Sequence, residues 1–255
     1  MSTHVKITNG NRVLSIEIDR AERKNAITAD MYQAMADALR AAEADPQVRV
    51  VLFHGKADCF TAGNDLKDFL DRPPSGENSP VFQFLQAIST AAKPIVAAVG
   101  GPAVGIGTTM LLHCDFVYAA PNARFQLPFV PLGLVPEAGS SLLLPMLAGY
   151  QRAAELLMLG KPFTAEKALA AGIVTEIVPA EELLAYALES AAALAALPPA
   201  SLRQTKALMK APRAGGVAAA MASEGEKFRA QLGSAEAKEA MNAFFEKRKP
   251  DFSKF

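Results

Sequence analysis

The stretch KPIVAAVGGPAVGIG, residues 93–107, decides how this chain folds. The apolar residues 95–99 lie between a proline and a Gly-Gly pair, a pattern typical of a short buried strand. The glycine-containing turn at 100–107 then leads into another apolar segment, which predicts a strand–turn–helix unit. The spacing Gly-x-Gly-x-x-Gly and a Gly-Lys-Ser/Thr motif are absent, which argues against a dinucleotide loop and excludes a Walker loop. The turn therefore predicts a helix N-terminus with free backbone N–H groups.

The same rhythm of strand, turn and helix occurs before and after this stretch. Leu14, Ile16 and Ile18 alternate with polar residues, as one face of a strand does. Thr28 can cap a following helix, because its hydroxyl can accept a hydrogen bond from the first helical turn. The apolar side of that helix would carry Met31, Met35, Ala38 and Ala42; residues 48–53 and 116–119 would form further strands, and 108–113 a short helix. This alternation predicts an α/β fold.

Two segments depart from that rhythm. Residues 71–80, DRPPSGENSP, are polar and rich in Pro and Gly, which predicts a mobile surface loop. From about residue 180 the chain becomes helical, and Pro198-Pro199 separates one helix from the next. The Ala-rich run 185–197 is interpreted as a packed helix. We therefore expect a core over residues 1–195 and a C-terminal helical region over 196–255, which would form a lid or an oligomer interface.

Composition makes several partners unexpected. The 255 residues carry 26 Lys+Arg and 26 Asp+Glu, so no overall charge attracts nucleic acid or an anionic membrane. The two cysteines and three histidines show no metal-ligand or disulfide spacing, so neither a metal nor a disulfide framework is expected. The first eight residues lack a signal-peptide pattern, and we expect a cytoplasmic, bacterial protein. Ser253-Lys254-Phe255 differs by one residue from the peroxisomal Ser-Lys-Leu address and indicates that location only weakly.

A second glycine-containing turn lies earlier, in CFTAGNDL, residues 59–66. It follows the predicted strand at 48–53, and Gly63 would let the backbone approach a ligand closely. Taken alone, this segment fits an ordinary turn as well as a binding site. Together, the two turns can each aim one N–H at a single oxygen and form an oxyanion hole. A thioester carbonyl that becomes an enolate is a suitable guest, because negative charge grows on its oxygen.

An enolate also needs a base, and residues 93–150 contain only two acidic residues, Asp115 and Glu137. Asp115 begins a predicted strand and is interpreted as structural. Glu137 lies among apolar residues in LGLVPEAG, residues 132–139, just before an expected helix. It is either a proton carrier or a helix N-terminal acid. Burial would raise its pKa and a helix N-terminus would lower it, so the sequence leaves the direction open.

These segments resemble the crotonase superfamily, which contains enoyl-CoA hydratases and isomerases, from Val13 to about Ile177, with a compatible helical C-terminus. The pattern is most similar to that of the peroxisomal-type Δ3,Δ2-enoyl-CoA isomerases. The matching segments, in the family's order, are Phe60–Leu66, Gly101–Ile106, Leu132-Gly133 followed by Pro136-Glu137, Lys161–Phe163 and Gly172–Val174. The resemblance implies a spiral of ββα units and a homotrimer or a dimer of trimers.

The resemblance also implies roles for single residues. The oxyanion donors would be the backbone N–H groups of Asn64 and Ile106, and Glu137 would transfer the proton. An acyl-CoA substrate would contact residues of the two turns and one nearby aromatic ring: Ala62, Gly63, Asp65, Leu66, Gly105 and Phe129. CoA would be part of the substrate, with no permanently bound cofactor.

Two departures from the family's pattern favour one reaction. The two glutamates typical of a hydratase would fall at Thr109 and Phe129, neither of which ionises near neutral pH. Hydration needs one group to activate water and another to supply a proton. Moving a double bond needs only one carboxylate, which takes a proton from C2 and returns it at C4. Glu137 suits that scheme, and Phe129 would help to exclude water.

Two alternatives remain beside the 3-enoyl-CoA to trans-2-enoyl-CoA isomerase. One is another crotonase-type reaction, such as hydration of an unusual acyl-CoA, thioester hydrolysis or decarboxylation, because one fold supports several chemistries. The other is an acyl-CoA-binding module that kept the oxyanion hole and lost catalysis. The acid at Glu137 argues against the silent module.

Overall fold

The strands form an open, mostly parallel sheet, which confirms the expected α/β class. The computed structural model describes residues 2–56, 58–72, 76 and 78–255. Within these residues the larger sheet has the order β1-β2-β3-β4-β6-β9, with β1 and β2 antiparallel and the later pairs parallel. Its strands are β1 (Val5–Gly10), β2 (Val13–Ile18), β3 (Val50–His54), β4 (Ile95–Val99), β6 (Phe116–Ala119) and β9 (Glu176–Ile177). A smaller sheet has the order β5-β7-β8, with β5 (Pro102–Val104), β7 (Arg124–Gln126) and β8 (Phe163–Thr164).

Helices cover both faces of the larger sheet. Because successive strand side chains point to opposite faces, β3 contributes to two apolar cores. Val51 and Phe53 join the core formed with α1 (Ala29–Ala44) and α3 (Pro80–Thr90). Val50 and Leu52 instead pack with α8 (Leu183–Ala196) on the other face. This burial on both faces explains why the central strand β4 is apolar throughout.

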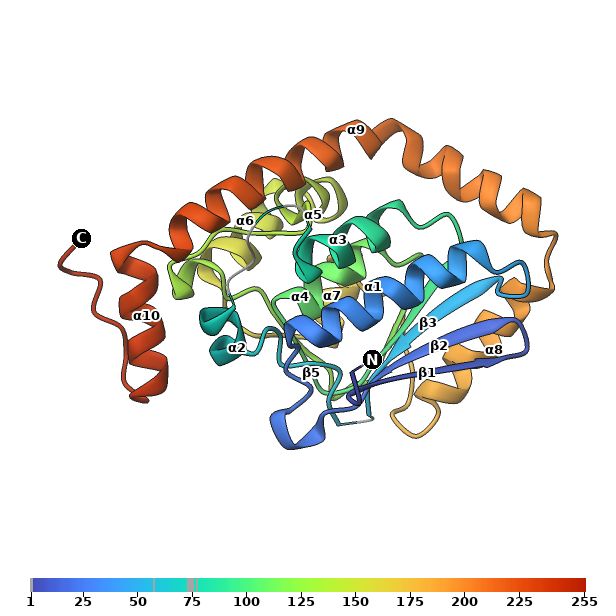
Figure 1. Cartoon of the computed structure of the whole chain (residues 1–255), viewed down its shortest axis with the longest axis horizontal. Helices are drawn as coiled ribbons and strands as arrows, with labels where there is room; N and C mark the ends of the chain where they lie inside the picture. The colour runs from blue at the N-terminus through green and yellow to red at the C-terminus, as the bar shows by residue number, and fades with distance from the viewer. Residues whose placement is uncertain (1, 57, 73–75, 77) are drawn as a thin grey trace.

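A long C-terminal helix runs along one side of the molecule. Figure 1 shows α9 (Pro199–Leu232) passing over α5 (Ser140–Ala148) and ending near α10 (Ala235–Phe245). The remaining elements are α2 (Leu66–Asp71), α4 (Ile106–Thr109), α6 (Tyr150–Leu159), α7 (Ala165–Ala170) and the 3₁₀ turns η1 (Ala21–Arg23), η2 (Met110–His113) and η3 (Val130–Leu132). The contact between α9 and α5 brings α9 close to Glu137, because α5 begins three residues after Glu137.

Several local expectations are confirmed. Thr28 Oγ1 accepts a hydrogen bond from the Met31 amide at 3.4 Å and caps α1, whose predicted apolar face is buried. Asp115 is structural: its Oδ2 accepts from the Ile95 amide at 2.7 Å and pairs with Lys206 Nζ of α9 at 2.7 Å. The helix expected at 108–113 differs, since α4 begins two residues earlier and gives way to the 3₁₀ turn η2.

The Ala-rich segment also folds as expected. Its alanines at 187, 191 and 195 are buried. The helix α8 ends at Ala196, and α9 begins at Pro199. Part of the loop expected at 71–80 (residues 73–75 and 77) lies outside the described residues. Among the described residues, no single helix is long and apolar enough to cross a membrane; α8 and α9 pass that test only as a pair, which is bent by 107°. The division into regions 1–195 and 196–255 stays a prediction.

Candidate active site

The two glycine-containing turns lie side by side, as an oxyanion hole requires. The Thr61 amide donates to Pro102 O at 2.9 Å, and the Val104 amide donates to Thr61 O at 3.0 Å. A Cβ on Gly63 would come within 2.7 Å of Val104 O, and one on Gly107 within 2.5 Å of Thr61 Cγ2. Only glycine therefore permits this close approach of the two turns.

The Asn64 amide points away from the chain that supports its turn. On either side of it, Gly63 O accepts from the Ile27 amide at 2.8 Å and the Asp65 amide donates to Ile27 O at 2.9 Å. In an extended segment, the backbone groups of the intervening residue point the opposite way. In the described part of the chain no acceptor is recorded for the Asn64 N–H, which is free to bind a ligand oxygen.

The Ile106 amide is free for a different reason. Ile106 is the first residue of α4, and the first N–H groups of a helix have no carbonyl within the helix to bind. The amides of Thr108 and Thr109 both donate to Gly105 O, at 2.8 and 3.0 Å, whereas the Ile106 amide has no recorded acceptor among the described residues. The positive φ of Gly105, 56°, gives the chain the turn that starts the helix.

Both turns line one open cavity of about 570 Å³. Eight of the nine site residues expected from the sequence meet there: Ala62, Gly63, Asn64, Asp65, Leu66, Gly105, Ile106 and Phe129. The cations Arg23, Lys24 and Lys67 also line it. These three were not singled out in the sequence, because the balanced total charge hides a local cluster; the structure brings them together from separate segments.

Glu137, the ninth residue, lines an adjoining cavity. This second cavity shares Asn64, Phe69 and Phe228 with the first. Its other walls come from α1, α3, the Glu137 turn and α9, and include Tyr32, Phe82, Leu85, Met221, Glu224 and Arg229. A ligand that spans both cavities would therefore pass the Asn64 amide between the cationic mouth and the Glu137 carboxyl.

The surroundings of Glu137 settle the direction that the sequence left open. Burial is the largest cause and raises the pKa of Glu137. The Thr109 hydroxyl, which donates a hydrogen bond to Oε1, lowers this pKa, and the charge of Glu224 raises it. The net effect is a pKa of about 8. The other oxygen, Oε2, has no recorded partner in the described residues, and Glu137 keeps some accessible surface because it lines the cavity. Such a carboxyl can exchange a proton near neutral pH.

Thr109 has a contact that its sequence position alone did not reveal. It stands where a hydratase would carry a glutamate, and it is completely buried. Its hydroxyl holds the Glu137 carboxyl in place instead of acting on water. Phe129, at the second such position, is buried and lines the first cavity without lining that of Glu137.

The Asp65 side chain, near the first turn, forms its hydrogen bonds within the protein. Asp65 caps α2 by accepting from the Lys67 and Asp68 amides, both at 3.1 Å, and pairs with Arg20 Nη1 at 2.7 Å. Burial raises the pKa of Asp65, but the hydrogen bonds from Arg20 and the backbone amides together lower it by more. The net shift of the Asp65 pKa is therefore downward. Asp65 therefore remains an anion that fixes the turn.

Tyr32 is a site residue that sequence reasoning missed. It lies in α1 beside the apolar positions that predicted the helix, so the pattern gave no reason to separate it from the core. The Tyr32 hydroxyl donates to Asn64 Oδ1 at 2.5 Å and fixes the Asn64 side chain. Burial and the charge of Glu137 raise the pKa of Tyr32, so its hydroxyl stays a donor.

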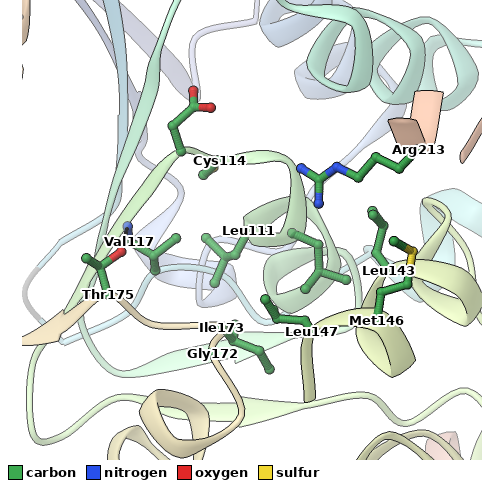
Figure 2. A pocket seen from close by; sticks show the side chains of 12 residues that line it. Leu111, Cys114, Val117, Leu143, Met146, Leu147, Gly172, Ile173, Thr175 and Arg213 are labelled. Carbon is green, nitrogen blue, oxygen red and sulfur yellow. Dashed lines mark hydrogen bonds between the residues drawn. The ribbon is translucent and has the colours of Figure 1, made fainter. Parts of the chain in front are cut away.

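A third hollow, of about 300 Å³, lies apart from these two cavities. Figure 2 shows the side chains of Leu111, Leu147 and Ile173 turned into it and Arg213 reaching toward it. Its described lining shares no residue with either cavity at the turns. It is therefore not part of the candidate active site.

Known proteins resemble this chain over most of its length. The family model described as "Enoyl-CoA hydratase/isomerase" matches residues 8–254. Enoyl-CoA delta isomerase 2 of Homo sapiens is 37% identical over 211 residues, which cover 80% of this chain and 53% of that protein. The chain thus spans about half the length of that relative. The 2,3-dehydroadipyl-CoA hydratase of Escherichia coli (strain K12) is 31% identical over 247 residues, covering 96% of this chain and 97% of that protein.

The solved structures agree with the family match. The crystal structure of an enoyl-CoA hydratase/isomerase from Pseudoalteromonas atlantica T6c superposes with a TM-score of 0.95 at 47% identity, covering 98% of this chain and 100% of that one. This confirms the crotonase-type α/β fold expected from the motifs. The chain belongs to the enoyl-CoA hydratase/isomerase family of the crotonase superfamily.

Proposed function

We propose that the protein is a Δ3,Δ2-enoyl-CoA isomerase, which converts a 3-enoyl-CoA to a trans-2-enoyl-CoA. One observation carries the proposal: Glu137 is a carboxyl with a raised pKa, in a cavity that adjoins the Asn64 and Ile106 amides, and one of its oxygens has no partner among the residues that the structure describes. The other acid in that cavity, Glu224, has both oxygens bound to backbone amides. Glu137 is thus the carboxylate with an oxygen free to take a proton.

The proposed reaction moves one proton and consumes nothing. Ionised Glu137 takes a proton from C2 of the substrate. The electron pair of that C–H bond forms a double bond between C1 and C2, and the carbonyl π electrons move onto the thioester oxygen, so that the enolate is conjugated with the C3–C4 double bond. The Asn64 and Ile106 amides stabilise the charge on that oxygen in the resulting dienolate. Glu137 then returns the proton to C4, which leaves the double bond between C2 and C3 and restores the carboxylate.

The cavity chemistry supports isomerisation over addition of water. Hydration would use two groups, one to activate water and one to supply the proton. The Thr109 hydroxyl donates a hydrogen bond to Glu137, and Phe129 offers only an apolar ring. One carboxyl with one hydroxyl partner suffices for a proton that leaves and returns to the same substrate.

CoA as the carrier of the acyl group is supported by the charge at the cavity mouth. Phosphates are anions, and Lys and Arg side chains bind them with charge-assisted hydrogen bonds. Arg23, Lys24 and Lys67 line the first cavity, whereas Glu137 lines the second. The proposed substrate thus places its phosphates among these cations and its acyl chain beside Glu137, with no further cofactor.

The proposal is tested by identifying products from a panel of acyl-CoA thioesters. With a 3-enoyl-CoA, we expect a conjugated 2-enoyl thioester of unchanged mass as the main product. Hydration would add the mass of water and give a hydroxyacyl-CoA, whereas hydrolysis would release free CoA. Either of these as the main product, or tight binding without turnover, would contradict the proposed reaction.

Hydration is the second candidate function. It is favoured by the relative named 2,3-dehydroadipyl-CoA hydratase, which matches the chain over nearly its whole length. If this activity is present, a 2-enoyl-CoA will gain water at a rate comparable to the isomerisation of a 3-enoyl-CoA. The same panel therefore separates the two candidates.

We also propose that the chain assembles as a homotrimer or a dimer of trimers. Large apolar side chains remain exposed on α5, α6 and α9, namely Met146, Leu147, Tyr150, Met158, Leu208 and Met209. Extended apolar patches on a soluble chain mark association surfaces. Light scattering should give a mass of three or six chains of 27.0 kDa; a stable monomer at micromolar concentration would contradict the assembly.

A further inference from the structure

The chain makes a strained turn immediately after Glu137. Ala138 has a φ of 60° and Gly139 a φ of 71°, both in the left-handed region. Glycine adopts this conformation freely, but alanine does so at a cost, because its Cβ crowds the backbone. Strained residues persist where the surrounding structure holds them, and they are concentrated at functional sites. The groups that hold this turn therefore also determine where the Glu137 side chain points.

Glu224 of α9 holds this turn through two hydrogen bonds. Its Oε2 accepts from the Gly139 amide at 2.6 Å, and its Oε1 accepts from the Ser141 amide at 2.8 Å. On the other side, His113 Nε2 donates to Ala138 O at 2.7 Å. The peptide group that joins Ala138 to Gly139 is thus fixed at its C=O by His113 and at its N–H by Glu224, two side chains that are distant from it in sequence.

The burial of Glu224 indicates a specific task. Only 6% of it is exposed, and buried carboxylates are rare unless their charge is compensated. In the described residues no Lys or Arg pairs with Glu224. Its charge is instead balanced by two amides at the start of α5, where the helix dipole favours an anion. Glu224 therefore acts as an N-terminal cap supplied by another helix.

We propose that Glu224 is a positioning residue for proton transfer: from α9, it fixes the turn at Ala138 and Gly139 so that the Glu137 carboxyl points into the acyl cavity. This inference rests on the proposed role of Glu137 as proton carrier. It gives α9 an indirect part in the reaction, because α9 supplies both this cap and several walls of the cavity.

Glu224 also contributes to the electrostatics of Glu137. The titratable or charged groups around the carboxyl and its turn are Tyr32 from α1, His113 from η2, and Glu224 and Arg229 from α9. Burial keeps His113 neutral near pH 7 by lowering its pKa to about 4, and it raises the pKa of Tyr32. The charge of Glu224 is, after burial, a further cause of the raised pKa of Glu137.

Three variants test the inference in the full-length protein. Glu224→Gln keeps the size of the side chain but removes the charge, and its amide NH₂ must face one of the two N–H donors. Glu224→Asp keeps the charge but is one methylene too short to reach both amides. Glu226→Gln is the matched control, because Glu226 lies on the same helix, is exposed and lines neither cavity.

The expected results separate positioning from charge. With a 3-enoyl-CoA, both Glu224 variants should lose roughly 10- to 100-fold in kcat, as a misplacement of about 1 Å can cause, with KM little changed. In Glu224→Gln the acidic limb of the pH–rate profile should also move to lower pH, because removing the negative charge lowers the pKa of Glu137. In Glu224→Asp that limb should stay near its wild-type position. Hydrogen exchange at the Gly139 and Ser141 amides should accelerate in both variants and not in Glu226→Gln.

A merely structural Glu224 would give a different pattern. The Glu224 variants would then melt at lower temperature, but the folded variants would have the same kcat and pH profile as Glu226→Gln. That result would overturn the inference and leave the proposed function intact. If Glu137→Gln itself retained turnover, the proposed function would fail first, and the inference with it. If neither Glu224 variant folds, the test is hydrogen exchange in the wild-type protein, with the Ala98 amide of β4 as the reference. Faster exchange at the Gly139 amide than at the Ala98 amide would show that the turn is not held, and it would also overturn the inference.

Discussion

Glu137→Gln should lower the turnover of a 3-enoyl-CoA by roughly 10²- to 10⁴-fold, the range typical of removing a general acid–base group. Glutamine has nearly the same shape and can still accept the hydrogen bond from the Thr109 hydroxyl. It cannot take a proton from C2, so the chemical step is lost while the cavities keep their form. The measurement is kcat and KM for wild type and variant, together with the dissociation constant of a non-reactive acyl-CoA, which should change little.

The pH dependence gives an independent check on the same residue. Glu137 must be ionised to act as a base, and its pKa is raised to about 8. The kcat/KM of the wild-type enzyme should therefore fall as the pH decreases through about 8. The residual rate of Glu137→Gln should lack this limb, whereas Glu226→Gln should keep it. A variant with a near-wild-type rate would remove Glu137 from the mechanism.

The same substitution should stabilise the protein. The pKa of Glu137 is higher in the folded state than the usual value of 4.5, so its ionisation opposes folding. This cost is absent below about pH 4.5, grows as the pH rises, and is complete above about 8. At pH 9, Glu137→Gln should therefore melt at a higher temperature than wild type, and its free energy of unfolding should be larger by up to a few kcal/mol. At pH 4 the two proteins should melt at nearly the same temperature. A gain in stability with a loss of turnover is the expected signature of a functional buried acid.

Local patterns predicted much of the fold. The β4 strand and the β6 strand have the bounds that their apolar runs indicated, and the Thr28 cap and the Pro198-Pro199 break lie where expected. These features depend on neighbouring residues, so periodicity and turn chemistry suffice. The smaller sheet was not predicted, because β5, β7 and β8 are only two or three residues long and are stabilised by partners distant in sequence.

The candidate site shows the same limit. The two turns could be recognised, since glycines and small residues mark a close backbone approach. The contacts that tune the acid could not, because they join Glu137 to Thr109, and its turn to Glu224, across 28 residues and more. Glu224 lies in a polar helix where an acid is ordinary, and only its burial against the α5 N-terminus distinguishes it. Such a partnership is a property of packing and not of a local pattern.

The second large effect is expected at the proposed oxyanion hole. Ile106→Pro removes a single N–H donor, which typically costs about 10²–10³ in kcat. Proline is well suited to this place, because Ile106 is the first residue of α4 and proline favours the first position of a helix. The preceding residue is Gly105, which has no Cβ to clash with the proline ring. The backbone should therefore keep its course while the donor is lost.

The matched control is Ile106→Ala, which removes most of the same buried side chain but keeps the N–H. Both variants lose apolar packing, since Ile106 is almost completely buried, and both should be less stable than wild type. Only the proline variant should also lose the factor in kcat that the Ile106 N–H contributes. That N–H binds the charge that develops on the thioester oxygen in the transition state, and it contributes less to the binding of the substrate in its ground state. Equal kcat values for the two folded variants would show that the Ile106 amide does not bind the developing charge, and the hole would then have to be assigned to other donors around Asn64.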